Sequence, residues 1–368
     1  MAIRRIAILG AGNGGCAAAA DLALKGYEVR LYSRSESTLK PILERGGVTV
    51  VEGKNRSFGR LGLVTRDIGD AVAGVDLIMM TVPSVGHEYL GKKLAPHLSE
   101  EQILLLNPGH TGGSLHLASV LSGAGLKAKI KICETVTLTY ICRLTGPARL
   151  EIFRRTAHLR CAAFPGKFGS EIVAEIAKIY PNIVPAENVL ETGLCNINAI
   201  MHPAGMIGNA GRIERSQGDF YFYRDGITLG IANIIAAVDQ ERLRIVKTVG
   251  LSPLSFVEIF YQAGLTTEAA RSSGSIYRSI RESPPNRTIK SPKTLDHRYL
   301  HEDVGYGLVP MAEIAKLVGV ETPVIDGLIA VASEMNSIHY RREGLTLDRM
   351  GLSRVKAEDL STLLQEGF

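Results

Sequence analysis

The chain begins with short apolar runs separated by stretches that suit helices. Residues 6–9 form an apolar run that ends at a glycine turn, and residues 16–25 are alanine-rich, with Gly26 placed to stop a helix. Residues 28–32 then alternate polar and apolar side chains, as a half-buried strand does. This pattern predicts one complete strand–helix–strand unit over residues 4–32.

Two further apolar runs, residues 76–82 and 103–106, each lead into a loop that contains proline or glycine. Short runs that are apolar throughout are typical of strands buried on both faces, and such strands alternate with helices in parallel sheets. We therefore expect an α/β fold whose N-terminal part is a doubly wound parallel sheet of the Rossmann type.

Beyond about Pro185 the alternation gives way to long helical patterns. Amphipathic stretches that end at glycine or follow proline lie at residues 228–248, 310–318 and 323–335. The sequence thus predicts two domains, the Rossmann domain over residues 1–186 and an all-helical C-terminal domain over residues 187–368.

One segment of the helical half breaks this pattern. Residues 271–298 are rich in Ser, Pro, Arg and Lys, and the pair Pro284 and Pro285 excludes regular structure. We expect a long loop here, and loops of this length are more often functional or mobile than inert.

Composition limits the classes of function. The chain has 368 residues, 45% of them hydrophobic and 21% charged, as is typical of soluble globular proteins of two domains. No run approaches the ~20 apolar residues of a membrane helix, and residues 1–10 contain too short an apolar run for a signal peptide, so we expect a cytoplasmic protein with no membrane partner. The net charge of +5 suits an anionic ligand, while dispersed Lys and Arg without any Trp argue against nucleic acid. Five scattered cysteines without a Cys-x-x-Cys pair argue against disulfides and against a metal site.

The first glycine turn carries the clearest chemistry. The motif G-x-G-x-x-G lies between the predicted first strand and first helix, where a dinucleotide site requires it. Gly10 permits the tight turn, Gly12 lets the backbone approach a pyrophosphate, and Gly15 lets the helix pack on the strand. Helix N–H groups that point at the anion complete the site. The sequence predicts a dinucleotide site formed by Gly10, Gly12, Asn13, Gly14 and Gly15.

The end of the second strand bears on the choice of dinucleotide. An acidic residue normally binds the ribose 2′-OH there, but this chain has Ser33 and Arg34 instead. Ser33 can donate a hydrogen bond to a 2′-phosphate, and Arg34 can pair with it. We predict that NADP(H) is the preferred cofactor and NAD(H) the alternative. An ordinary solvated surface arginine is the competing interpretation of Arg34.

His202 stands out among the nine histidines because it lies in an apolar helical stretch just before Pro203. Asn198 precedes it by four positions, so the two side chains share one helix face. Pro203 should disturb the backbone hydrogen bonds at this point, as is common at functional sites. The residues alone fit both a buried histidine of the core and a catalytic acid/base.

Several motifs together carry a family resemblance. They run in order through nearly the whole chain as Gly10-x-Gly12-Asn13-Gly14-Gly15, Asn107-Pro108-Gly109-x-Thr111-Gly112-Gly113, Cys142-Arg143, Asn198-Ala199-x-Met201-His202-Pro203 and Arg298-Tyr299-x-x-Glu302-Asp303-Val304. The chain resembles the octopine/nopaline dehydrogenase family, and within it most closely the bacterial branch that makes N-(1-carboxyethyl)-norvaline. The resemblance implies a two-domain enzyme that reductively condenses the amino group of an amino acid with an α-keto acid, using NAD(P)H and releasing water.

The resemblance also implies roles for residues in the helical half. His202 is similar to the catalytic histidine of the family and Asp303 to its acidic partner. A carboxylate bonded to one imidazole nitrogen fixes the tautomer, so the other nitrogen can pass a proton to the substrate oxygen. Arg298 matches an arginine that reaches toward bound cofactor, which would couple cofactor binding to domain closure. A capping carboxylate and a surface arginine are the competing interpretations of Asp303 and Arg298.

Candidate contacts to the substrate are more dispersed. His110 occupies a position where relatives hold Gln or Ala, so it either tunes keto-acid binding or fills the loop. Thr111 lies in the same loop, which follows a strand at the edge where open α/β sheets bind ligands. Thr135 and Thr137 are candidate hydroxyl contacts to a substrate carboxylate, and Asn198 shares the face of His202.

Two other functions remain open. One is a plain 2-keto acid reductase, because Rossmann-plus-helical proteins also reduce ketopantoate and fold alone does not fix function. The other is a non-catalytic NADP-sensing protein, which gives no reason for the pairing of His202 with Asp303. The Ser33-Arg34 pair departs from the acidic residue of the bacterial branch and places NAD use in doubt. Apolar faces of the helical domain lead us to expect a homodimer.

Overall fold

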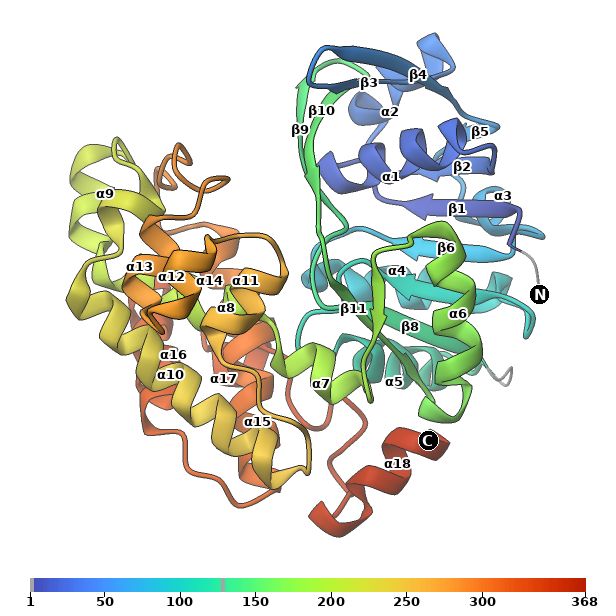
Figure 1. Cartoon of the computed structure of the whole chain (residues 1–368). Coiled ribbons are helices and arrows are strands. Elements are labelled where there is room, and N and C mark those ends of the chain that lie inside the picture. Colours follow the sequence, from blue (N-terminus) through green and yellow to red (C-terminus); the bar gives the residue numbers. More distant parts are fainter. Residues whose placement is uncertain (1–2, 127–129) are drawn as a thin grey trace. The chain divides into compact units, whose positions relative to one another are not determined.

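The computed structural model describes residues 3–126 and 130–368, which divide into two compact units (Figure 1). Unit 1 comprises Met1–Gly109, Gly113–Thr192 and Thr362–Phe368, and unit 2 comprises His110–Gly112 and Gly193–Ser361. The expected division at residue 186 falls a few residues before this one. The end of the chain returns to unit 1 because the ring of Phe368 packs edge-on against Phe164, with 5.3 Å between centroids.

The described residues of unit 1 contain an eight-stranded sheet with the order β12-β11-β8-β7-β6-β1-β2-β5 (Figure 1). Neighbouring strands are parallel throughout, except that β11 runs antiparallel to β8. The strands are β1 (Arg5–Leu9), β2 (Glu28–Tyr32), β5 (Leu63–Thr65), β6 (Leu77–Met80), β7 (Ile103–Leu106), β8 (Lys131–Thr135), β11 (Leu159–Phe164) and β12 (Ile183–Pro185). The predicted Rossmann-type sheet is confirmed, with two reversed strands, β11 and β12, that the sequence pattern did not indicate.

Helices cover both faces of this sheet. They are α1 (Asn13–Leu24), α2 (Glu36–Arg45), α3 (Ile68–Val72), α4 (His87–Leu94), α5 (Gly113–Gly123), α6 (Gly169–Ile179) and α7 (Val189–Leu194), and α18 (Leu360–Glu366) follows near the C-terminus. The predicted strand–helix–strand unit corresponds to β1, α1 and β2, with Gly26, two residues after the helix ends, in the left-handed region at φ 90°.

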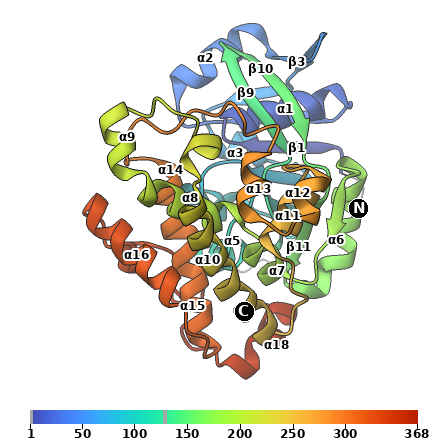
Figure 2. The same cartoon turned by 60° about the vertical axis from the view of Figure 1, so that its left-hand side comes forward.

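A second, four-stranded sheet that we did not predict packs on α1, in the order β4-β3-β10-β9 (Figure 2). Its strands are β3 (Gly47–Glu52), β4 (Asn55–Arg60), β9 (Tyr140–Gly146) and β10 (Arg149–Arg155). Helix α1 therefore lies between two sheets, which explains why the four alanines at residues 17–20 are fully buried. A Cβ on Gly59 of β4 would lie 2.7 Å from the Cα of Ala20, so only small residues permit this approach.

Unit 2 is built of helices, as the sequence predicted. They are α8 (Ile197–Gly208), α9 (Ala210–Ser216), α10 (Leu229–Thr248), α11 (Phe256–Gln262), α12 (Glu268–Ser272), α13 (Ile276–Arg281), α14 (Arg298–Asp303), α15 (Val309–Leu317), α16 (Pro323–Asn336) and α17 (Tyr340–Glu343). Two turns are π-helical, Phe222–Gly226 and Val304–Leu308. Helix α10 begins where Thr228 accepts a hydrogen bond from the N–H of Ile231, 3.5 Å away.

The prediction of a long loop over residues 271–298 is partly wrong. Its first part contains the end of α12 and all of α13, because Ser275 caps α13 by accepting a hydrogen bond of 3.2 Å from the N–H of Arg278. An ion pair from Arg278 to Glu282, one turn further along, supports the same helix. The serines of this segment therefore indicate the start of a helix as well as a loop. No helix occurs from residue 282 until α14, as the proline pair predicted.

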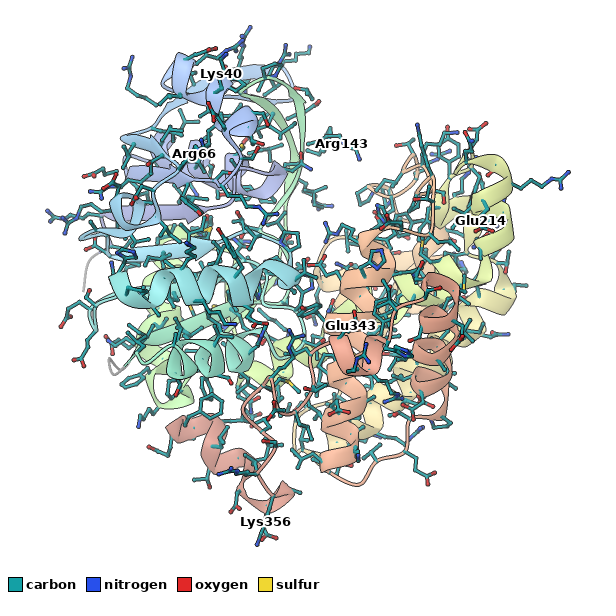
Figure 3. The ribbon with its side chains drawn as sticks, turned by 180° about the vertical axis from the view of Figure 1, so that it is seen from behind. Lys40, Arg66, Arg143, Glu214, Glu343 and Lys356 are labelled. Carbon is teal, nitrogen blue, oxygen red and sulfur yellow. The ribbon has the colours of Figure 1, made fainter. Side chains whose placement is uncertain are left out.

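Charged side chains such as Lys40 and Arg66 of unit 1 and Glu214 and Glu343 of unit 2 are exposed (Figure 3). Among the helices of residues 3–126 and 130–368, none has both the length and the apolar character needed to cross a lipid bilayer.

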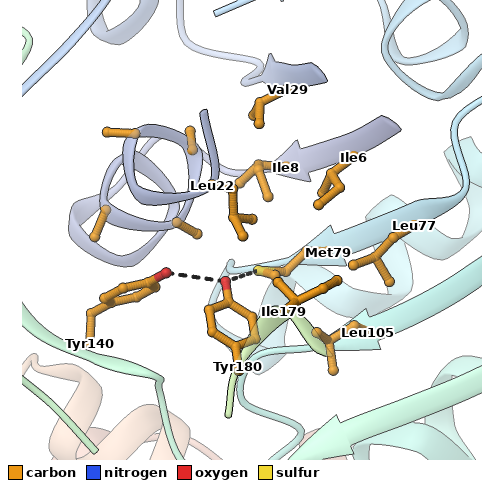
Figure 4. Packing of buried hydrophobic residues seen from close by; sticks show 14 of the residues in the cluster. Ile6, Ile8, Leu22, Val29, Leu77, Met79, Leu105, Tyr140, Ile179 and Tyr180 are labelled. Carbon is orange, nitrogen blue, oxygen red and sulfur yellow. Dashed lines mark hydrogen bonds between the residues drawn. The ribbon is translucent and has the colours of Figure 1, made fainter. Parts of the chain in front are cut away.

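Two apolar clusters hold the large sheet in place. Ile6 and Ile8 of β1 pack with Leu22 of α1 on one face (Figure 4), whereas Ala7 and Leu9 face α3, α4 and α5 on the other. All five side chains are fully buried, and full burial of a side chain such as Leu or Ile is worth roughly 1.5–3 kcal/mol. This packing fixes the carboxyl end of β1, where the glycine turn begins.

Candidate active site

Among the glycines of the turn between β1 and α1, Gly10 and Gly15 are required by the fold and Gly12 is not. Gly10 has φ 116°, and a Cβ on Gly15 would lie 1.7 Å from the carbonyl oxygen of Gly10. A Cβ on Gly12 would meet no atom within 4 Å. Gly12 is also the N-cap residue of α1, so no side chain caps the start of this helix. The turn therefore leaves backbone N–H groups at an open helix N-terminus, which fits a pyrophosphate.

A cavity of about 450 Å³ lies beside this turn, entirely within unit 1. It is lined by the turn, the end of β2 and the segment after β6, through Gly10, Ala11, Gly12, Tyr32, Ser33, Arg34, Thr38, Thr81, Val82, Pro83, Val85, Gly86, Tyr89 and Leu90. Ser33 is half-buried and Arg34 is exposed, with its guanidinium 5.9 Å from the ring centroid of Tyr89. The structure thus places Ser33 and Arg34 in the same cavity as Gly10 and Gly12, so the residues present fit a dinucleotide.

Asn13 and Gly14 of the same motif serve a different contact. The side-chain oxygen of Asn13 accepts a hydrogen bond of 2.8 Å from the N–H of Leu144 in β9. A Cβ on Gly14 would lie 2.7 Å from Leu138. Asn13 thus joins the turn to the second sheet, and Gly14 lets the turn approach Leu138, just before β9. A cofactor contact of either residue stays a prediction.

In unit 2, a buried histidine and a buried carboxylate form a close pair. His202 lies on α8 and Asp303 ends α14, and the Nδ1 of His202 is 2.7 Å from the Oδ2 of Asp303. Because an ionised carboxylate only accepts hydrogen bonds, Nδ1 carries the proton and donates it. The predicted pair is therefore formed in the structure. Helix α8 continues through Pro203 without ending there.

Two tyrosines complete the surroundings of His202. Its Nε2 is 2.9 Å from the hydroxyl of Tyr223, and the ring of Tyr299 stacks on the imidazole with 3.7 Å between centroids and 13° between planes. The two tyrosine hydroxyls are 3.2 Å apart. Burial, together with the neighbouring Tyr299 and Asp303, raises the pKa of Tyr223 well above its usual value.

The backbone around this cluster is unusual. Tyr223 lies in the π-helical turn Phe222–Gly226, and Asp303 immediately precedes the π-helical turn Val304–Leu308. Such turns are rare and frequently occur at functional sites. We did not predict Tyr223 from the sequence. The sequence feature that could have indicated Tyr223 is the run of four aromatic residues from 220 to 223, in a chain of only 6% aromatic residues.

A second imidazole–carboxylate pair adjoins the first. The Nε2 of His110 is 3.1 Å from Glu302, whose other oxygen binds Arg298 at 2.9 Å. Burial opposes a charge on His110, but the neighbouring Glu302 outweighs it and raises the pKa of His110 above 6.5. His110 has φ 60°, a left-handed conformation that is uncommon for residues other than glycine. The side chain of Arg298 is 54% exposed and can therefore reach a ligand.

The remaining predicted residues fall in both units. Thr111 donates a hydrogen bond of 2.9 Å to the carbonyl of Gly193 in unit 2, where Asn198 lies half-buried on α8. Thr135 is buried in unit 1 and donates to the carbonyl of Thr137 at 2.9 Å. The structure thus groups His110, Thr111, Asn198, His202, Arg298 and Asp303 in unit 2, and it places Thr135 and Thr137 in unit 1.

A dinucleotide cavity in a Rossmann unit and a buried imidazole–carboxylate pair in a helical unit define an NAD(P)-dependent oxidoreductase. The family model described as "NAD/NADP octopine/nopaline dehydrogenase, alpha-helical domain" matches residues 185–336. That described as "Ketopantoate reductase PanE/ApbA" matches residues 6–121.

Similar proteins agree with these matches. The chain is 34% identical to the opine dehydrogenase of Arthrobacter sp. (strain 1C), over 98% of both chains. It is 29% identical to the protein ocs of Agrobacterium vitis, over 96% of this chain and 97% of that one. The structure of octopine dehydrogenase with NADH and L-arginine shares the fold, with a TM-score of 0.81 and 19% identity over 99% of this chain and 98% of that one. The chain therefore belongs to the octopine/nopaline dehydrogenase family.

Proposed function

We propose that this protein is an opine dehydrogenase, which condenses the amino group of an amino acid with an α-keto acid such as pyruvate and reduces the product with NADPH, reversibly. The observation that carries this proposal is the buried pair of His202 and Asp303, 2.7 Å apart, in the helical unit. The similarity to the opine dehydrogenase of Arthrobacter, at 34% identity over 98% of this chain, supports the same reaction.

The reaction needs a group that moves protons. The amine nitrogen adds to the keto carbon and gives up one proton to the former carbonyl oxygen, which must take up a second proton before it leaves as water. The nicotinamide supplies the hydride that reduces the resulting C=N bond. His202 supplies the proton from the side of Nε2, while Asp303 holds the Nδ1 proton and stabilises the charged imidazole. In the reverse direction the same imidazole accepts the proton.

We infer that NADP(H) is the preferred cofactor and that NAD(H) is the alternative. The N–H groups at Gly12 and at the start of α1 would hold the pyrophosphate. Ser33 and Arg34, which line the same cavity, would bind the 2′-phosphate. The fold accommodates both dinucleotides, since octopine dehydrogenase was solved with NADH and yersinopine dehydrogenase with NADP⁺.

We also propose how the substrates are held. Glu302 favours the charged form of His110, which would attract a carboxylate, and Arg298, which also binds Glu302, would contact the cofactor. Thr111 and Asn198 supply further polar contacts. Thr135 and Thr137 stay candidates for the substrate carboxylate, although the Thr135 hydroxyl already donates to Thr137.

A cytoplasmic homodimer fits these features. The five cysteines are all free thiols, as in a reducing compartment. Unit 2 exposes large apolar side chains, including Leu229 at 64% and Val331 at 46%, which an interface between copies would cover.

The test is a cofactor-oxidation assay with pyruvate, glyoxylate, oxaloacetate or 2-oxoglutarate, with and without each amino acid. We expect oxidation that depends on the amino acid. A plain 2-keto acid reductase, which the match of residues 6–121 to ketopantoate reductase favours, would oxidise NADPH equally fast without amine. The proposal also requires that His202→Ala lower kcat by orders of magnitude while cofactor affinity stays the same; an unchanged rate contradicts it. A non-catalytic sensor would bind cofactor without turnover.

A further inference from the structure

The hydrogen bonds around His202 leave neither imidazole nitrogen open to a substrate. Nδ1 is bonded to Asp303 and Nε2 to the hydroxyl of Tyr223, at 2.7 and 2.9 Å. The stacked ring of Tyr299 covers one face of the imidazole. A substrate oxygen that exchanged a proton directly with Nε2 would have to displace Tyr223.

Displacing Tyr223 would be costly. The residue is only 4% exposed, and its ring packs edge-on against Phe222 with 5.2 Å between centroids. Its hydroxyl lies 3.2 Å from that of Tyr299, so moving the side chain breaks two hydrogen bonds inside a buried cluster. Buried polar groups that are left without partners destabilise the fold.

The tautomer of His202 fixes the direction of these bonds. With the Nδ1 proton on the side of Asp303, a neutral imidazole accepts at Nε2, so the Tyr223 hydroxyl donates to it and accepts from Tyr299. When the imidazole is charged, Nε2 donates instead, and the Tyr223 hydroxyl proton turns outward. A tyrosine hydroxyl both donates and accepts, so it can pass on a proton without becoming charged.

We propose that the hydroxyl of Tyr223 is a catalytic group that relays the proton between His202 and the substrate oxygen. This inference rests on the proposed function and deepens it, because it names the atom that touches the substrate. Tyr299 is a positioning residue. Its hydroxyl contacts that of Tyr223, and its stacked ring holds the plane of the imidazole.

The relay balances in both directions. In condensation, the Nε2–H of His202 passes to the Tyr223 oxygen while the Tyr223 proton passes to the oxygen that leaves as water. The imidazole ends neutral, with its proton still on Nδ1 and hydrogen-bonded to Asp303, and the tyrosine ends as it began. In the reverse reaction a water proton moves to Tyr223 and the Tyr223 proton to Nε2. The phenol stays neutral throughout, in keeping with the pKa of Tyr223, which burial and the neighbouring Tyr299 and Asp303 raise.

The direct test is Tyr223→Phe, which keeps the ring and its packing and removes only the relaying oxygen. We expect kcat to fall by about 100-fold, within the usual range for lost acid–base catalysis, with the KM of amino acid and keto acid unchanged. Tyr221→Phe is the matched control two residues earlier. Its ring lies against Arg224 and Lys290, away from His202, so kcat should not change.

A second measurement separates a relay from a structural role. The solvent isotope effect on kcat, measured in mixtures of H₂O and D₂O, should vary nonlinearly with deuterium content in the wild type, because two protons move together. In Tyr223→Phe it should become linear. Tyr299→Phe keeps the stacked ring, so it should lower kcat only severalfold and keep the nonlinear dependence.

These outcomes distinguish the relay from the proposed function. If Tyr223→Phe turns over as fast as the wild type or faster, while His202→Ala is inactive, the substrate contacts Nε2 directly and the relay is wrong. A linear dependence on deuterium in the wild type overturns the relay even if Tyr223→Phe fails to fold. If His202→Ala remains active, the proposed function itself fails.

Discussion

Glu302 and Asp303 are consecutive residues of α14, yet their carboxylates bind two different imidazoles. Glu302 lies 3.1 Å from His110, and Asp303 lies 2.7 Å from His202. Successive side chains of an α-helix point about 100° apart, so one helical turn can hold two histidines that come from distant parts of the chain. The two pairs can therefore be separated by mutation.

The first prediction concerns Asp303→Asn. The asparagine amide fits the same space but can hold the wrong tautomer of His202 and cannot stabilise its charge. A comparable change in a serine protease triad lowers kcat ~10⁴-fold, and we expect a loss of about 10² to 10⁴ here, with KM little changed. Asp296→Asn is the matched control, because it removes a carboxylate from an exposed pair with His301. Comparable kcat values for both variants would show that the carboxylate of Asp303 has no catalytic role.

The second prediction concerns the pH dependence of stability. Since folding raises the pKa of His110 above 6.5 through Glu302, this pair stabilises the fold fully below pH 6.5 and loses its contribution as pH rises through the folded pKa. His110→Gln removes the titrating group and keeps a polar side chain. The difference in free energy of unfolding between wild type and this variant should shrink as pH rises, in urea titrations at several pH values. A difference that grows with pH would contradict the raised pKa.

Local sequence was sufficient for much of the Rossmann unit. The glycine turn and its flanking elements are short-range features, so β1, α1 and β2 followed from patterns within about thirty residues of the N-terminus. The second sheet did not follow, because β3 pairs with β10 about a hundred residues later and β4 is mostly exposed. Pairing over such a distance leaves no periodic signal in either strand.

The candidate site likewise could be predicted only in part from the sequence. The pairing of His202 with Asp303 came from the family resemblance, because the two lie far apart in the sequence and nothing local relates them. Tyr223 was missed, since its role depends on a π-helical turn that brings its hydroxyl to His202. Hydrogen bonds between distant elements appear only once the backbone is known.

The third prediction uses two glycines of one motif. A methyl group on Gly15 would lie 1.7 Å from a backbone oxygen, so Gly15→Ala should destabilise unit 1 by about 3 kcal/mol or more. Gly12→Ala meets no atom within 4 Å and should change stability by less than about 1 kcal/mol. The Gly12 methyl would instead stand where the cofactor approaches, which should weaken cofactor binding at least about tenfold. Thermal melting and a fluorescence titration with NADPH measure both effects. Equal melting temperatures for the two variants, or unaltered NADPH affinity in Gly12→Ala, would contradict this assignment.

The fourth prediction tests the choice of cofactor through Arg34. A charge-assisted hydrogen bond is worth about 1.5–3 kcal/mol, so Arg34→Ala should lower kcat/KM with NADPH by roughly 10- to 100-fold and leave kcat/KM with NADH unchanged. Because Arg34 is exposed, added salt should also reduce the advantage of NADPH in the wild type. Arg66→Ala is the control: this arginine is exposed in the same unit and pairs with Glu36 at 2.7 Å. A wild-type protein that uses NADH as well as NADPH would refute the assigned preference. An equal loss with both cofactors in Arg34→Ala would mean that Arg34 supports the cavity without reading the 2′-phosphate.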